Sequence, residues 1–318
     1  MMGSIQSLVH ENYPSYINQI LRPSKRPKYT VLDLFAGCGG LSLGFESAGF
    51  KSIGMECDEH CCNTYNNNLQ GECNQEFITS KTKFPKADII IGGPPCQPFS
   101  VGGKQLGNDD KRNGFPAFIK AVEKTKPSVW MFENVRGMMY RNKEYFELSL
   151  KKLGKLGYHV EYRLLNAVEY GVPQNRERVI AIGCKGKFDY PKPFDKKVTS
   201  GEALEELAFE IPEDSKFLTP SMDRYVAVYE KKSKLITPRD LHLDRPARTL
   251  TCRNLAGSTA DMHRIKLYDG RRRRLRVTEA ARLQSFPDWF EFLGNETSKF
   301  NQIGNAVPPL FARHIKKN

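Results

Sequence analysis

Short apolar runs alternate with amphipathic segments from Tyr29 onward, and this alternation limits the possible folds more than any other feature of the chain. The runs predict strands at 29–35, 51–55, 87–91, 128–132, 159–165 and 178–183. The segments between them predict helices at 41–48, 58–68, 115–125 and 144–156. Strand and helix repeated at this spacing predict an α/β fold with a doubly wound, mostly parallel sheet.

The regular pattern ends near Cys184, where the composition changes. Residues 185–247 are rich in Lys, Pro and Asp, and only 203–208 and 223–230 are predicted to be helical there. Further helices are predicted at 277–284 and 308–316. At roughly 150 residues per domain, 318 residues fit two domains or one large domain with an insertion. We therefore predict a lead-in (1–28), a first domain (29–184), a small irregular second domain (185–275) and a return to the first (276–318).

The chain is strongly basic, and its charge is unevenly distributed. Lys and Arg number 49 against 36 Asp and Glu, a formal net charge of +13. This charge predicts a polyanionic partner, either nucleic acid or an anionic membrane surface. Between Asp223 and Asp288 there are 16 Lys and Arg against 8 Asp and Glu, and Arg271–Arg274 is the densest block. The block fits contact with phosphates, but also a solvated loop or a nuclear localisation signal.

Composition also excludes two classes of protein. Unbroken aliphatic runs are as short as Ile89–Ile91, far below the roughly 20 residues of a membrane span. The first thirty residues carry Glu11, prolines and polar side chains in place of an apolar signal core. Eight cysteines without a secretory signal are expected to be reduced thiols. We therefore expect a cytoplasmic protein, neither a membrane protein nor a secreted disulfide scaffold.

A glycine-rich turn, 33–40, follows the first predicted strand. Its glycines allow close approach of the backbone to a ligand, and the helix behind it adds a partial positive field. The dinucleotide-binding pattern G-x-G-x-x-G requires glycine where Ser42 stands. Glu56, at the end of the second strand, is placed to accept hydrogen bonds from ribose hydroxyls. A nucleoside without pyrophosphate, such as S-adenosylmethionine, therefore fits better than NAD; a plain strand-to-helix turn is the alternative.

Cys96 differs from the other cysteines because of its neighbours. The segment 92–100, GGPPCQPFS, ends a predicted strand, and two prolines stiffen the turn that carries the thiol. Ligands bind at this carboxyl edge in such sheets, and a thiolate is a strong nucleophile. The other cysteines are expected to be core residues. A zinc site is an alternative for one group whose spacing matches no common structural pattern, namely Cys57, His60, Cys61 and Cys73.

Two further segments place charged residues at the ends of predicted strands. Glu133, in the segment FENV, would lie at the same carboxyl edge as Cys96, or would cap a helix or face solvent. The segment 174–178, QNRER, opens a strand, and alternate residues of a strand share a face. Arg176 and Arg178 are therefore expected to point to the same side.

These segments, in this order, resemble the signatures of the DNA (cytosine-5) methyltransferase family, prokaryotic modification type. The glycine turn, Pro-Pro-Cys-Gln, Glu-Asn-Val, Gln-x-Arg-x-Arg and the late segment 302–308, QIGNAVP, all match, interrupted only by the stretch near 185–247. The resemblance implies a Rossmann-like, S-adenosylmethionine-dependent methyltransferase domain with a small, irregular target-recognition domain. It implies methylation at C5 of a cytosine flipped out of a specific duplex DNA sequence, with S-adenosylhomocysteine as product.

The resemblance also implies roles for single residues. Cys96 would add to C6 of cytosine in a covalent intermediate, and Glu133 would hold the exocyclic amine and N3. Arg178 would contact the base carbonyl, with Arg176 as its active-site neighbour. The implied cofactor site comprises Phe35, Ala36, Gly37, Cys38, Gly39, Gly40, Leu41, Glu56, Cys57, Glu76, Phe77, Pro94, Phe115, Asn305, Ala306 and Val307. Recognition domains do not transfer between relatives, so the DNA contacts are a separate hypothesis. We expect them at Gln97, Ser100, Arg248, Arg253, Ser258, Thr259, Arg271, Arg272, Arg273 and Arg274, with the last four meeting phosphates.

Duplex DNA is accordingly the expected partner, and a restriction endonuclease acting on the same site would fit a modification enzyme. We expect a monomer that is nucleoid-associated when bound to DNA, with no metal and no membrane contact. An RNA (tRNA) cytosine-5 methyltransferase with DNA-type motifs is the main alternative. A non-catalytic DNA-binding relative is disfavoured by intact Cys96, Glu133 and Arg178, and an NAD-dependent oxidoreductase by Ser42.

Overall fold

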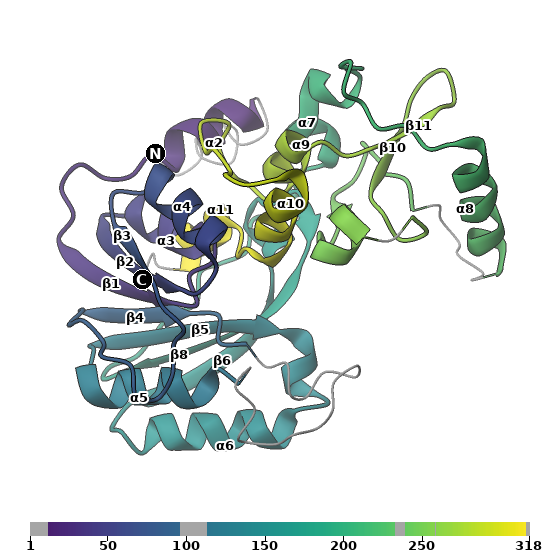
Figure 1. Ribbon diagram of the computed structural model, residues 1–318. Coiled ribbons are helices and arrows are strands. Elements are labelled where there is room, and N and C mark those ends of the chain that lie inside the picture. The colour runs from purple at the N-terminus through teal and green to yellow at the C-terminus, as the bar shows by residue number, and fades with distance from the viewer. Residues whose placement is uncertain (1–11, 96–112, 233–238, 258, 316–318) are drawn as a thin grey trace. The chain divides into compact units, whose positions relative to one another are not determined.

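The computed structural model describes residues 12–95, 113–232, 239–257 and 259–315, which form two compact units (Figure 1). The sheet unit comprises Leu21–Ala167, Glu177–Pro193 and the chain from Val307 on. The insertion unit comprises the chain up to Ile20, Val168–Arg176 and Phe194–Ala306. Two segments of the insertion unit thus interrupt the sheet unit. The domain limits at residues 28, 184 and 275 stay a prediction.

The sheet unit is built on seven strands in the order β3-β2-β1-β4-β5-β8-β6. Strands β1 to β5 pair in parallel, whereas β8 is antiparallel to both β5 and β6. The α/β class and the mostly parallel sheet are therefore confirmed. The strand order reverses beside β1, which opens the carboxyl edge there to a ligand. The strands are β1 (Tyr29–Leu34), β2 (Phe50–Glu56), β3 (Glu72–Gln75), β4 (Ile89–Gly92), β5 (Val129–Val135), β6 (His159–Asn166) and β8 (Glu177–Cys184).

Helices cover both faces of this sheet (Figure 1). One face carries α5 (Phe115–Thr125) and α6 (Lys143–Gly154), and the other carries α3 (Gly40–Glu46), α4 (Glu59–Asn68) and α11 (Pro309–Ile315). Beneath α5 and α6 lies an aromatic core in which Phe118, Trp130 and Phe132 are fully buried. Each such side chain contributes about 1.5–3 kcal/mol of burial free energy, so this core fixes the strands whose ends carry the motifs.

Helices α3 and α11 approach so closely at Gly44 that this contact can be tested. A Cβ added at Gly44 would lie 2.5 Å from Ala312 Cβ and 2.6 Å from Arg313 N. Gly44→Ala is therefore expected to lower the free energy of unfolding by about 1–3 kcal/mol, measured by urea denaturation. The matched control is Gly154→Ala, where the added Cβ would meet only Val160 at 3.8 Å. Equal effects of the two substitutions would contradict this contact.

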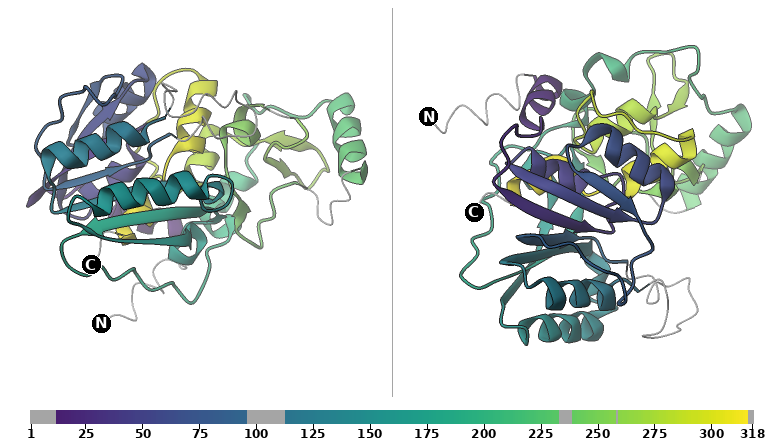
Figure 2. Two further views of the ribbon diagram at one scale, coloured as in Figure 1. Left: turned by 90° about the horizontal axis from the view of Figure 1, so that it is seen from below. Right: turned by 60° about the vertical axis from the view of Figure 1, so that its left-hand side comes forward.

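The insertion unit holds short elements around a small apolar core. Its helices are α2 (Tyr13–Ile20), α7 (Ser200–Leu204), α8 (Pro220–Lys232), α9 (Val277–Leu283) and α10 (Glu296–Asn305). Its strands form two pairs, β7 (Gln174–Asn175) with β9 (Ala247–Arg248) and β10 (Arg264–Lys266) with β11 (Arg272–Arg274). Helix α8 lies beside the β10–β11 hairpin (Figure 1, Figure 2).

Several of these elements differ from the prediction. Helix α2 lies in the predicted lead-in, and Tyr13 and Ile17 of this helix are buried. Helix α10 and the β10–β11 hairpin were not predicted, whereas the predicted helices near 223–230 and 277–284 are present. The predicted helix 203–208 is replaced by the end of α7 and a 3₁₀ helix at Glu205–Ala208. Across the described ranges, no helix has both the length and the apolar character that a bilayer crossing requires.

Candidate active site

Glu133 and Arg178, two predicted catalytic residues, lie together in the sheet unit. Strands β5 and β8 run antiparallel with Val135 opposite Arg178, so β8 starts beside the end of β5. Arg178 Nε lies 2.6 Å from Glu133 Oε1, and both side chains are only 12% exposed. A charge-assisted contact this short fixes the orientation of the carboxylate at the carboxyl edge of β5.

Gly93, three residues before Cys96 in the sequence, lies beside this ion pair. A Cβ added at Gly93 would lie 3.8 Å from Glu133 Oε2. Asn134 Nδ2 donates to the Pro94 carbonyl at 2.9 Å, which anchors the prolines to β5. Asn134 belongs to the Glu-Asn-Val segment, and this hydrogen bond gives it a positioning role. Cys96 itself lies outside the described residues, as do Gln97 and Ser100.

Arg176 is buried within the insertion unit. Strands β7 and β8 are separate and Arg176 lies between them, so the prediction that Arg176 and Arg178 share one strand face is wrong. The Arg176 side chain is 1% exposed. Its guanidinium donates to the carbonyls of Leu250, Gly304 and Ala306 at 2.7 to 3.1 Å, all within the insertion unit. A buried guanidinium needs such acceptors, and a direct catalytic role for Arg176 stays a prediction.

The glycine turn is attached to the end of β2. The backbone angle φ is positive at Phe35 (62°) and Gly37 (55°), a region that glycine enters readily. Glu56 accepts the N–H of Gly37 on Oε2 and the N–H groups of Cys57 and Asp58 on Oε1. A carboxylate offers about four lone pairs, so Oε2 can accept one further donor such as a ribose hydroxyl. The remaining acceptor capacity of Glu56 therefore fits a ribose hydroxyl of a nucleoside.

Two other predicted cofactor residues lie near Glu56. The N–H of Glu76 donates to the Glu56 carbonyl at 2.7 Å, which places Glu76 and Phe77 beside the end of β2. The Phe77 ring is 56% exposed and so is accessible to a stacking ligand. Phe115, in contrast, is fully buried, with its ring centroid 5.1 Å from that of Phe132. In this structure Phe115 is a core residue.

The remaining predicted cofactor residues are divided between the units. Those in the sheet unit are Ala36, Cys38, Gly39, Gly40, Leu41, Cys57, Pro94 and Val307. Only Cys57 among them is exposed. Burial raises the pKa of the Cys38 thiol to about 12, so this thiol stays protonated at neutral pH. Asn305 and Ala306 belong to the insertion unit.

Asp33 is the second-last residue of β1 and has a buried carboxyl group. It is 1% exposed and accepts a 2.7 Å hydrogen bond from Ser42 Oγ. Burial raises the pKa of Asp33 to about 7, against the lowering effect of the Ser42 hydrogen bond. An unfolded aspartate titrates near 3.9. The folded chain therefore binds more protons than the unfolded chain between about pH 4 and pH 7.

Asp33→Asn is accordingly expected to change the pH dependence of stability. In the unsubstituted chain, ionisation of this carboxyl group should lower the free energy of unfolding by about 2–3 kcal/mol as pH rises from 5 to 7. Well above the folded pKa, the group should cause no further change in stability. The asparagine variant should lack this fall. Urea unfolding of both proteins at pH 5, 6, 7 and 8 measures the difference. Parallel pH profiles would mean that Asp33 does not titrate in this range.

The basic block Arg271–Arg274 is largely engaged within the insertion unit. Arg273 is fully buried and forms an ion pair with Glu279 at 2.7 Å, and the Glu279 side chain is also fully buried. Because a guanidinium without exposed surface cannot reach a phosphate, the prediction of a DNA contact is wrong for Arg273. Arg272 pairs with Asp240 at 3.0 Å. Arg271 is the most exposed of the four, with 55% of its side chain accessible.

The other residues predicted to contact DNA differ in their intramolecular contacts and in their exposure. Arg248 pairs with Asp261 at 3.0 Å, and Arg274 donates to the Leu255 carbonyl. Arg253 is exposed, Thr259 is half-buried, and Ser258 lies outside the described residues. DNA contacts of these residues stay a prediction.

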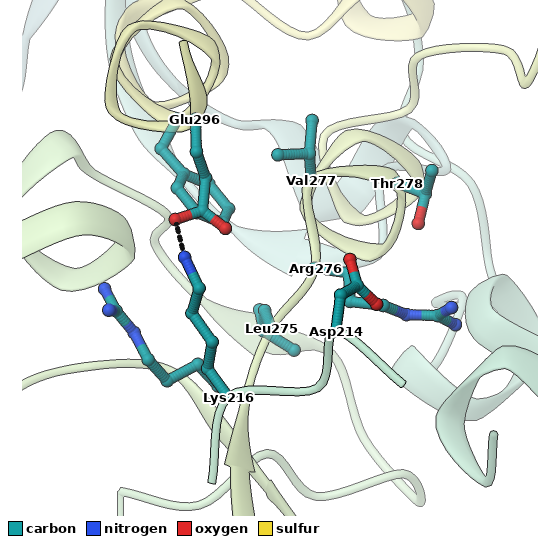
Figure 3. A pocket seen from close by; sticks show the side chains of 9 residues that line it. Asp214, Lys216, Leu275, Arg276, Val277, Thr278 and Glu296 are labelled. Atoms are coloured by element: carbon teal, nitrogen blue, oxygen red, sulfur yellow. Dashed lines mark hydrogen bonds and ion pairs between the residues drawn. The ribbon is translucent and has the colours of Figure 1, made fainter. Parts of the chain in front are cut away.

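A cavity of about 250 Å³ lies in the insertion unit, and none of its lining residues is a predicted catalytic or cofactor residue (Figure 3). Leu275, Val277 and Phe300 supply its apolar lining. An ion pair between Lys216 and Glu296 crosses one side, as the dashed line in Figure 3 marks. Charges of both signs line this cavity, so it does not have the character of a phosphate site.

The zinc site considered as an alternative is not assembled. Within the described ranges, no three or more His, Cys, Asp or Glu side chains are grouped to hold a metal ion. Cys73 Sγ lies 3.6 Å from Cys62 Sγ, and both side chains are buried. Their burial raises the pKa of both thiols, which suits core residues.

Comparison with known proteins decides the family. The model of the C-5 cytosine-specific DNA methylase family matches residues 29–318. The chain belongs to this family. It is 52% identical over 312 residues to a Type II methyltransferase, M.AplI of Arthrospira platensis, covering 96% of this chain and 90% of that protein. Type II methyltransferase M1.HphI of Haemophilus parahaemolyticus is 35% identical over 327 residues, covering 90% and 85%.

Solved structures agree with the fold of the methylase. A protein described as a DNA modification methyltransferase encoded within an Escherichia coli prophage is 25% identical, with a TM-score of 0.65 and coverage of 91% of this chain and 97% of that chain. Spodoptera frugiperda DNMT2 is 18% identical, with a TM-score of 0.68 and coverage of 90% and 98%. The predicted family, the methyltransferase fold and the enzyme class, DNA (cytosine-5) methyltransferase, are confirmed, and an NAD-dependent oxidoreductase is excluded.

Proposed function

We propose that this methylase is the modification enzyme of a Type II system and methylates one cytosine of a specific duplex DNA sequence. The similar proteins from A. platensis and H. parahaemolyticus bear the name Type II methyltransferase, which supports such a system with its companion endonuclease. The observation that carries the chemistry is the Glu133–Arg178 ion pair beside the backbone that leads to Cys96. The enzyme would act as a monomer on DNA in the cytoplasm.

The ion pair suits recognition of an extruded cytosine, whose C6 cannot be reached inside the duplex. The Glu133 carboxyl would accept from the exocyclic amine and donate a proton to N3. A guanidinium has five N–H groups. Arg178 Nε contacts the Glu133 carboxylate, and Nη1 donates to the Glu177 carbonyl. Other N–H groups of Arg178 can therefore donate to the base carbonyl.

Covalent addition of Cys96 would then make C5 nucleophilic. The thiolate forms a bond to C6 while N3 takes the proton from Glu133, and the electron pair of the C5–C6 bond becomes an enamine. C5 accepts the methyl group. A base then removes the C5 proton, the C6–sulfur bond breaks to restore the C5–C6 double bond and the thiolate, and N3 returns its proton to Glu133.

The glycine turn, Glu56 and Phe77 would hold S-adenosylmethionine. Bound there, it would supply an electrophilic methyl group and leave as S-adenosylhomocysteine. Glu56 Oε2 would accept a ribose hydroxyl, and the exposed Phe77 ring would pack against the adenine. The open space around Gly37 allows the ligand to approach the backbone of the turn, since a Cβ there would meet nothing within 4 Å.

Trapping the intermediate tests this function. Fluorine at C5 cannot leave as a proton would, so duplex DNA containing 5-fluorocytosine should form a detergent-stable adduct in the presence of S-adenosylmethionine. Peptide mapping should place the adduct on Cys96. Absence of an adduct on a library of duplex sequences, together with methyl transfer to tRNA, would replace the DNA function with the RNA alternative.

A further inference from the structure

Helix α8 directs both of its acidic residues toward the rest of the insertion unit. Val226, at the centre of its inner face, is fully buried in a small cluster with Leu218 and Met262. On the same face, Asp223 accepts from Arg272 Nη1 at 3.0 Å. One turn beyond Val226, Glu230 pairs with Arg264 at 2.7 Å.

These inner contacts fix the orientation of α8. The Arg264 side chain is fully buried and also pairs with Asp240, which in turn pairs with Arg272 at 3.0 Å. The two arginines come from β10 and β11, so two carboxylates of the helix are attached to both strands of the hairpin. An isolated helix of 13 residues is marginally stable, and these ion pairs together with Val226 hold it in one rotation.

The outer face of α8 has the opposite composition. Arg224, Val228 and Lys231 follow the i, i+4, i+7 spacing of one helical stripe, with Tyr225 and Lys232 beside them. Tyr225 is 56% and Val228 51% exposed. Within the described part of the chain, no hydrogen bond or ion pair engages the side chains of the three cations. The stripe contains no acidic residue.

The exposed faces of α5 and α6 each contain a pair of opposite charges. On α5, Lys120 pairs with Glu123 at 2.6 Å, and on α6, Lys143 pairs with Glu147 at 3.7 Å. Such alternation of charge is typical of a helix that faces only water. On α8, the acidic residues pair with arginines of the hairpin, and the outer face combines cations with an aromatic and an aliphatic side chain.

We propose that the outer face of α8 binds the major groove of duplex DNA and contributes to the choice of target sequence. An α-helix with its side chains is about 10–12 Å across, which matches the roughly 12 Å width of the major groove. Arg224, Lys231 and Lys232 supply positive charge that attracts phosphates, and they can donate hydrogen bonds to acceptor atoms of the bases. Val228 and Tyr225 supply apolar contact for a thymine methyl group. This proposal rests on the proposed function, in which the substrate is duplex DNA.

The charge contribution is tested with Arg224→Ala/Lys231→Ala/Lys232→Ala. Binding to a duplex that the unsubstituted enzyme methylates is followed by fluorescence anisotropy over a range of salt concentrations. Three lost phosphate contacts should reduce the slope of log K against log salt by roughly 2–3. The matched control removes three exposed lysines from or next to α6, Lys151→Ala/Lys152→Ala/Lys155→Ala. An equal reduction in both variants, or none on α8, would overturn the proposal.

Base reading is tested with substitutions that keep the charge. Arg224→Lys should leave the salt slope unchanged, whereas Val228→Ala/Tyr225→Ala should leave the three cations in place. At least one of the two should raise methylation of sites with a single mismatch, relative to the target, by roughly 5- to 100-fold. Circular dichroism and cofactor binding verify folding. Unchanged discrimination in both variants would refute a role of α8 in sequence choice.

Methylation assays report on the enzymatic function, whereas DNA-binding assays report on the outer face of α8. Methylation of DNA with a salt slope that does not depend on α8 would refute only the DNA-binding face. DNA binding that depends on α8, with no methylation of any DNA, would support the face and refute the function. Duplex RNA bound more tightly than DNA through the same residues would overturn the proposal for DNA.

Discussion

Replacing Cys96 by serine is expected to lower kcat/KM for DNA methylation by roughly 10⁴-fold or more. A serine hydroxyl is almost entirely protonated at neutral pH, so it cannot add to C6 of cytosine as a thiolate does. Binding of DNA and of cofactor should change little, because the substitution removes one step of the reaction and keeps the size of the side chain. Incorporation of tritiated methyl groups into duplex DNA measures the loss.

The control for this substitution is Cys184→Ser. The Cys184 thiol donates to the Gly186 carbonyl at 3.0 Å, a contact that a serine hydroxyl can also make. This variant should retain activity and should still form the adduct with 5-fluorocytosine DNA. If Cys96→Ser kept activity within tenfold of the unsubstituted enzyme, covalent catalysis through Cys96 would be refuted.

Glu133→Gln is expected to lower kcat by roughly 10²- to 10⁴-fold while the Kd for cofactor stays unchanged. An amide cannot deliver a proton to N3, and the substitution also leaves Arg178 without the carboxylate that it contacts at 2.6 Å. Single-turnover methylation under saturating DNA separates this loss from weaker binding. Because the two side chains act as a unit, combining Glu133→Gln with Arg178→Ala should cost much less than the product of the single effects.

The matched control for the carboxylate is Glu161→Gln on β6. Glu161 belongs to the same sheet and pairs with His159, at 3.1 Å, on the exposed surface. Its substitution should leave kcat unchanged. Similar losses in the two variants would show that the sheet tolerates no change of charge, and would remove the evidence for a specific role of Glu133.

The sheet was predictable because its central strands are long apolar runs. The prediction of secondary structure failed where only one face of an element is buried, or where its residues have a low propensity for that element. In β3 only Cys73 is buried, so the strand shows no clear alternation. Helix α10 contains Gly304 and two asparagines, which are weak helix formers. It forms because Asn295 caps its first turn and because Phe300 and Ile303 are buried.

The candidate site was predictable from motif order, although the partners within it were not. The resemblance assigned Glu133 and Arg178 to one site, and the register of β5 and β8 brings them together. The resemblance did not show that Arg176 and Arg178 have different partners. The partners of Arg176 lie 74 to 130 residues further along the chain, and no local pattern marks such contacts. The burial of Arg273 against Glu279 could not be predicted for a different reason. Four consecutive arginines are equivalent in sequence, and only the pairing of β11 with β10 determines which side chains face the core.

Helix α8 has a consequence for how a methylase of this kind acquires new targets. The residues that hold the helix, Asp223, Val226 and Glu230, alternate with the residues of its outer face along the chain. Outer residues can therefore be replaced without loss of the contacts that maintain the fold. Randomising the five outer positions, with the inner ones kept, would give a library of folded enzymes that differ in target sequence. Natural drift at the same positions would let a modification enzyme follow a change in the sequence cut by its endonuclease.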